Sequence, residues 1–153
     1  MLPEVAGIPT ELVLPTFSTR LLGRLVVFVN RPGFEIADDD WATYVQWLKS
    51  LQSQQAELAI LTAAGGRAPS SAQRSMISRE LKTDALRIAV LLSDPKLLAI
   101  VRVTSWFMRG TAAFKAHEID KALEFLGAPE SSARVRMTIR ELGGVVFSSS
   151  AAG

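Results

Sequence analysis

Short apolar runs rich in β-branched residues alternate with amphipathic segments along this 153-residue chain. The runs are residues 25–29, 58–62, 86–92 and 111–115, and each has the length of a buried strand. Segments with apolar residues at helical spacing follow them. Such alternation is typical of a parallel sheet covered by helices, because parallel strands are buried on both faces and need helical crossovers.

The helical segments carry start and stop signals. Asp38, Asp39 and Asp40 precede residues 41–54, and we expect them to supply a cap and a favourable charge at the positive end of a helix. Ser70 followed by Gln73 matches a capping box. Three further signals are a Ser93-Asp94-Pro95 start, a stop at Gly127 and a cap at Ser131.

These signals predict an α/β fold with a four- to five-stranded mixed, largely parallel sheet covered by helices. Residues 16–22, reversed at Gly23, are expected to form an N-terminal hairpin with residues 25–29. We predict one domain over residues 1–147, with its core at 16–127 and an extra C-terminal helix at 131–146. Residues 148–153 are predicted to be a disordered tail.

Composition narrows the class of protein. A hydrophobic content of 48% supplies a core and argues against disorder, and a net charge of +2 is too small for a nucleic-acid-binding footprint. The absence of cysteine removes disulfides and thiolate metal sites. The first residues do not read as a signal peptide, and no apolar run is long enough to span a bilayer. We therefore expect a cytoplasmic protein.

The order of elements resembles the STAS domain and its SpoIIAA-like relatives, in particular bacterial STAS/SEC14-like proteins. The resemblance covers about residues 16–127. It is carried by residues 25–29 with Trp41, by residues 59–61 and 88–92, and by Ala113-Phe-Lys-Ala-His-Glu-Ile-Asp-Lys-Ala-Leu-Glu-Phe-Leu-Gly127. It implies a STAS-like, non-enzymatic module that docks onto a partner protein, in some members under the control of Ser/Thr phosphorylation.

The family's switch serine matches the segment Ala68-Pro-Ser-Ser71 of this chain. Ala68 and Pro69 stand where the family has an Asp, so the segment departs from the pattern of a kinase-controlled switch. Ser70 and Ser71 are the candidate phosphorylation sites. The alternative is that Ser70 only caps the helix that follows it.

A candidate interaction surface lies on the predicted helix at residues 95–108, which is apolar around most of its circumference. The functional interpretation is a homodimer or partner interface with aromatic anchors and an arginine rim. The alternative is that the C-terminal helix covers the surplus apolar surface. The candidate interface residues are Ile100, Val103, Trp106 and Phe107, with Arg102 and Arg109 at the rim.

A candidate anion site lies where the predicted parallel strands end, because ligands bind at this edge of open α/β sheets. Glycines allow close backbone approach, and helix starts present free N–H groups. The alternative interpretation is that turn glycines and surface arginines account for the pattern, since it is no established phosphate-binding motif. The residues are Arg31, Gly65, Gly66, Arg67, Ser70 and Ser71.

The sequence thus predicts a non-enzymatic interaction or regulatory module that binds a partner protein or a second copy of itself. The alternative is a small-ligand binder that takes a lipid, or a nucleotide or phosphate. No catalytic residue, cofactor or metal site is predicted, because His117 is the only histidine and no nucleophile stands beside a base.

Overall fold

The computed structural model describes residues 4–5, 7–55, 57–63, 69–96, 98–99 and 110–144. These residues build one six-stranded sheet in the order β3-β4-β5-β6-β7-β8. Strands β3 to β5 are antiparallel and β5 to β8 are parallel, so the predicted α/β fold with a mixed sheet is confirmed. The strands are β3 (Glu11–Val13), β4 (Phe17–Leu22), β5 (Leu25–Asn30), β6 (Leu58–Ala63), β7 (Leu86–Leu92) and β8 (Thr111–Lys115).

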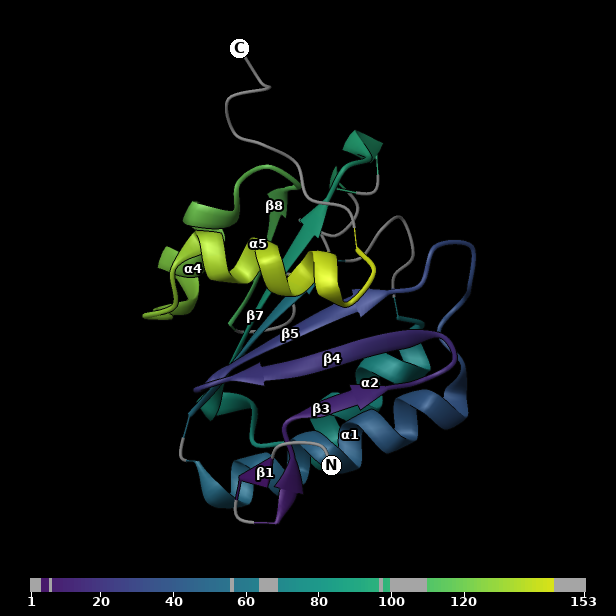
Figure 1. Ribbon diagram of the computed structural model, residues 1–153. Helices are drawn as coiled ribbons and strands as arrows, with labels where there is room; N and C mark the ends of the chain where they lie inside the picture. The colour runs from purple at the N-terminus through teal and green to yellow at the C-terminus, as the bar shows by residue number, and fades with distance from the viewer. Residues whose placement is uncertain are drawn as a thin grey trace.

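Helices cover both faces of the sheet, with α1 and α2 on one face and α4 and α5 on the other (Figure 1). The parallel strands lie in chain order, so successive right-handed crossovers place α1 and α2 on the same side. The helical elements are α1 (Asp38–Gln54), α2 (Ser71–Glu80), the 3₁₀ turn η1 (Thr83–Ala85), α4 (Ile119–Leu126) and α5 (Ser132–Glu141).

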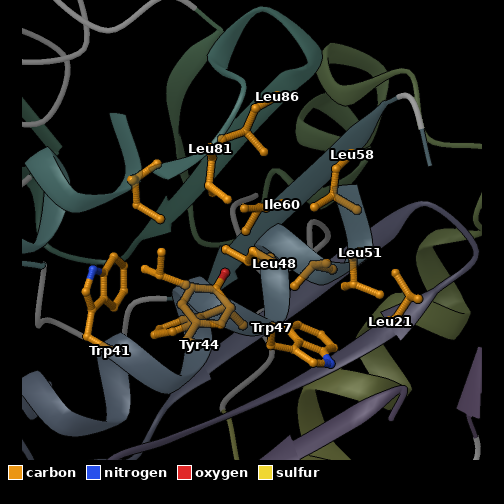
Figure 2. Close-up of a cluster of buried hydrophobic side chains, with 14 of the residues drawn as sticks. Leu21, Trp41, Tyr44, Trp47, Leu48, Leu51, Leu58, Ile60, Leu81 and Leu86 are labelled. Atoms are coloured by element: carbon orange, nitrogen blue, oxygen red, sulfur yellow. The ribbon is translucent and has the colours of Figure 1, made fainter. Parts of the chain in front are cut away.

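The first core lies between the sheet and helices α1 and α2. Aromatic side chains dominate it: Tyr44 lies within 5.5 Å of the rings of Phe17, Phe28 and Trp41, centroid to centroid. Figure 2 shows Tyr44 between Trp41 and Trp47, with leucines from α1, β6 and β7 packed around them. The complete burial of Tyr44 raises the pKa of its hydroxyl far above the ordinary range.

The second core lies on the opposite face, under α4 and α5. Its side chains alternate along β5 with those of the first core, since Leu25, Val27 and Val29 point to this face. Gly127 ends α4 in a left-handed conformation, as the sequence predicts. The two cores therefore bury both faces of β5, which explains why that strand is apolar at every position but its last.

The sheet has more strands than the four or five predicted. The edge strand β3 and a small separate hairpin of β1 (Glu4–Val5) and β2 (Ile8–Pro9) carry no strand signal, because prolines interrupt this part of the sequence. Tertiary contacts hold them in place. Arg20 on β4 pairs with Glu11 on β3 and with Glu141 on α5, and the Trp47 indole N–H donates to the Pro9 carbonyl at 2.7 Å.

One predicted helix is revised and another is described only at its start. The C-terminal helix ends at Glu141 and not at residue 146, because Gly143 adopts a left-handed φ of 90° just after it. The predicted helix at 95–108 begins at Pro95 as expected, and Leu98 packs on β7 and β8. Most of this second helix, and the predicted tail at 148–153, lie outside the described residues.

Candidate functional site at the carboxyl edge of the sheet

Asn30 is the last residue of β5, at the edge where the parallel strands end. It lies opposite Phe17 of β4, so its side chain projects to the same face as Phe28, toward α1 and α2. The side chain is nine-tenths buried, with the residue only 5% exposed. An amide therefore stands at the end of a strand that is otherwise wholly apolar.

The Asn30 amide has no hydrogen-bond partner: neither its nitrogen nor its oxygen is bonded, although both atoms are buried. An unsatisfied buried polar group costs about 1–3 kcal/mol, and native structures contain few of them. The cost is removed when a bound molecule or ordered water supplies the missing partners.

The start of α1 lies beside Asn30. Trp41 packs on Phe28 with a centroid distance of 6.2 Å, and the helix residues before Trp41 extend toward the same edge as Asn30. The Asp40 carboxylate is buried there and accepts hydrogen bonds from the backbone N–H and the hydroxyl of Thr16, at 2.9 and 2.6 Å. These two hydrogen bonds to one oxygen of Asp40 tie the segment before β4 to the start of α1.

Gln73 ties the start of α2 to the start of α1. Its side-chain amide donates to the Ile36 carbonyl and to the Asp38 carboxylate, both at 3.0 Å. Its backbone carbonyl accepts from the Trp41 indole N–H at 2.8 Å. Its side-chain oxygen accepts from the Ser70 backbone N–H, which completes the predicted capping box. The two helix starts therefore form one rigid rim above the strand ends.

A tight turn follows Asn30 directly. The Phe34 N–H donates to the Arg31 carbonyl at 3.3 Å across Pro32 and Gly33, and Gly33 has the left-handed φ of 81° that this turn requires. Phe34, the last residue of this turn, is 52% exposed. An exposed aromatic ring thus stands four residues from the buried amide.

The predicted anion-site residues are only partly brought together. Arg31 is exposed at this edge, where its Nε donates to the Leu14 carbonyl at 3.2 Å. Ser70 caps α2 by accepting from the Gln73 N–H at 3.1 Å, and Ser71 is exposed in the first turn. Gly65, Gly66 and Arg67 lie outside the described residues. Anion binding and phosphorylation at Ser70 or Ser71 stay predictions.

The candidate interface also stays a prediction, since Ile100, Arg102, Val103, Trp106, Phe107 and Arg109 all lie outside the described residues. One expectation at the edge itself was wrong. The aspartates at the start of α1 do not cap it, because Ala37 is the N-cap residue and forms no side-chain cap hydrogen bond. They contribute charge, and Asp38 and Asp40 bind Gln73 and Thr16 instead.

The sequence does not predict Phe34 or Gln73 as site residues. It places Asn30, with Arg31, in a loop at the carboxyl edge and in the segment that stops the strand, an ordinary role before a Pro-Gly turn, but assigns its side chain no contact. A long apolar run ending on an amide was the one available signal. Whether such an amide finds partners depends on packing, which no local pattern contains.

A hollow of about 690 Å³ lies at the opposite, amino edge, between the strand starts and the α4–α5 connection. Most of the charged residues that line it have partners within the protein. Arg87 donates to the Phe125 carbonyl at 2.9 Å, Arg134 lies 3.3 Å from Glu130, and Arg24 lies 3.7 Å from Glu57 on the exposed surface. The carboxyl edge, with its unpartnered buried amide, is therefore the stronger candidate site.

The far end of the carboxyl edge, after β8, carries a second polar turn. Glu118 accepts from the Lys121 ammonium and from the Lys115 backbone N–H, both at 2.8 Å. The hydrogen bond from Lys121, followed by that from Lys115, holds the pKa of the Glu118 carboxyl below its ordinary value. These hydrogen bonds of Glu118 close within the turn, so its carboxylate holds the start of α4 in place.

Among the described residues, no three His, Asp or Glu side chains are grouped as a metal ion would require. In the same part of the chain no helix has the length and apolar character needed to cross a bilayer. No protein-family model, curated protein or solved structure matches the chain.

Proposed function

We propose that this protein is a binding module that holds a small polar ligand at the carboxyl edge of its sheet, with Asn30 as the buried contact. The observation that carries the proposal is the Asn30 side chain, which is buried while both polar atoms of its amide have no partner. In open α/β sheets this edge is also where ligands bind.

The amide is costly to the unliganded protein. A leucine at the end of β5 would fill a similar volume without the penalty of an unsatisfied polar group, about 1–3 kcal/mol. A residue that lowers stability in this way is expected at a functional site, where stability is given up for binding. The amide then regains its hydrogen bonds only when the ligand is present.

Docking of a partner protein is the second candidate function. It is what the STAS resemblance implies and what the apolar helix at 95–108 predicts. The residues that carry it lie outside the described part of the chain, so it rests on the sequence alone. We prefer ligand binding because the Asn30 side chain, which lies in the described part of the chain, supports it.

The test compares Asn30→Leu with Thr19→Val. The hydroxyl of Thr19 is also buried without a partner, on the same face of the sheet but in the middle of β4. Both substitutions remove an unsatisfied polar group, so both are expected to raise the free energy of unfolding by about 1–3 kcal/mol. Only Asn30→Leu is expected to abolish ligand binding, so Thr19→Val is the matched control.

The measurements are urea unfolding of both variants, native mass spectrometry of freshly purified protein, and thermal shifts across small polar molecules. Retention of the ligand by Asn30→Leu contradicts the proposal. So does a crystal structure in which only ordered water contacts Asn30, if no molecule in the thermal-shift series stabilises the wild type.

A further inference from the structure

We infer that the ligand is a neutral planar group with an N–H donor beside an acceptor, as in a carboxamide or a nucleobase edge, and not an anion. This inference rests on the proposed binding site at Asn30 and names the chemistry that the site recognises. Four features of the described residues support it.

The first feature is the amide itself. A side-chain amide offers two N–H donors and a carbonyl acceptor, and in Asn30 both ends are unused. A fully ionised anion such as a carboxylate or a phosphodiester supplies acceptors only, so it would leave the Asn30 oxygen buried and unpaired. A group with a donor and an acceptor side by side satisfies both ends at once, as when asparagine binds the N6–N7 edge of adenine.

The second feature is the charge at the rim. Three carboxylates, Asp38, Asp39 and Asp40, occupy the first turn of α1. They already complement the positive end of the helix dipole, so α1 has little attraction left for an anion. A phosphate placed above Asn30 would also meet these carboxylates at short range, which disfavours it.

The third feature is the start of α2, which the capping box occupies. The Ser70 hydroxyl holds the Gln73 N–H, and the Gln73 side chain is fixed to Ile36 and Asp38. The rim arginines are each engaged through one N–H group, since Arg74 Nη1 donates to the Pro69 carbonyl and Arg31 Nε to the Leu14 carbonyl. In the described part of the edge, the capped start of α2 therefore offers an anion fewer free backbone N–H groups than an uncapped helix start does.

The fourth feature is Phe34. Phe34 ends the turn that follows Asn30 in the chain, and its side chain is half exposed. An aromatic side chain offers a stacking surface to a planar ligand whose edge reaches the amide. A buried amide and an exposed ring together favour a ligand that is planar and that forms hydrogen bonds at its edge.

The experiment titrates three probes into the full chain by calorimetry: adenosine, nicotinamide and inorganic phosphate. We expect the wild type to bind at least one neutral probe. Asn30→Leu is expected to weaken that binding about 10- to 100-fold. Phe34→Ala, at an exposed position, is expected to weaken it about 10-fold, and Thr19→Val to leave it unchanged. Circular dichroism checks that each variant is folded.

The probes also separate the two sources of this chemistry. Preference for adenosine over nicotinamide assigns the site to a nucleobase, and the reverse assigns it to a carboxamide. Phosphate binding that depends on Asn30, without binding of either neutral probe, overturns the assigned ligand class but leaves the proposed function standing. If no probe binds in an Asn30-dependent way and the purified protein carries no ligand, both proposals fail.

Discussion

Buried polar side chains on the α1–α2 face of the sheet differ in whether they form hydrogen bonds. Asp40, in the first turn of α1, is buried and accepts two hydrogen bonds from Thr16. The side-chain amide of Asn30, at the end of β5, is also buried but has no hydrogen bond. The Thr19 hydroxyl on the same face is also unpartnered, but it lies in the middle of β4, whereas Asn30 lies at the strand end where a ligand is proposed to bind.

Tyr44 gives a prediction on pH. It is the sole tyrosine of the chain, and burial raises its pKa above the ordinary value of 10.0. Below about pH 10 both the folded and the unfolded state keep the proton, so stability is unaffected. Above that pH the unfolded state ionises first, and the free energy of unfolding falls by about 1.4 kcal/mol per pH unit.

Urea unfolding between about pH 9 and pH 11 checks this, with Tyr44→Phe as the control that removes the contribution of the phenol. The phenolate absorbance should appear only as the protein unfolds. Ionisation of Tyr44 in the folded protein near its ordinary pKa would contradict the structure.

At the scale of elements, the starts of α1 and α2 depend on one side chain. Gln73 completes the cap of α2 and also bonds to Ile36 and Asp38 at the start of α1. The residue that completes the capping box of α2 therefore also joins α2 to the start of α1. It also fixes the rim of the proposed binding site.

Ser70→Ala and Gln73→Ala should therefore differ in cost. Loss of the Ser70 cap is expected to lower the free energy of unfolding by about 1 kcal/mol. Gln73→Ala should cost about 2–3 kcal/mol, because it removes three side-chain hydrogen bonds, to Ser70, Ile36 and Asp38, from a buried position. Ser131→Ala, a simple cap at α5, is the control and should match Ser70→Ala in urea unfolding. Equal costs for Ser70→Ala and Gln73→Ala would show that the bridge to α1 contributes nothing.

At the scale of the whole molecule, one sheet separates two cores. The strands β5, β6 and β7 contribute side chains to both, so each core supports the other through shared backbone. The described residues carry no second sheet large enough to fold around a core of its own. We expect the molecule to unfold as one cooperative unit.

Leu51→Ala on the α1 face and Ile139→Ala on the α5 face test this cooperativity, since both side chains are fully buried. Each should lower the free energy of unfolding by about 2–5 kcal/mol. In a Trp106→Phe background, where fluorescence comes only from Trp41 and Trp47 on the α1 face, tryptophan fluorescence and circular dichroism should give the same midpoint for both variants. Separate transitions in Ile139→Ala would show that the two faces unfold independently.

Local patterns in the sequence determined most of the regular structure. The strands at 86–92 and 111–115, the capping box at Ser70 and the stop at Gly127 were all predicted and confirmed. They were predictable because periodicity and capping depend on residues within one or two turns of each other. The early end of α5 could also have been predicted, since Gly143-Gly144 is a helix stop signal that the sequence analysis did not use.

Only the tertiary structure decided the rest. Strands β1 to β3 exist because of their pairing partners and the Arg20 and Trp47 contacts, which no local pattern encodes. The same holds for Asn30. The sequence determined that an amide ends β5, but hydrogen bonding is settled between segments that meet only after folding, and there the amide was left without a partner.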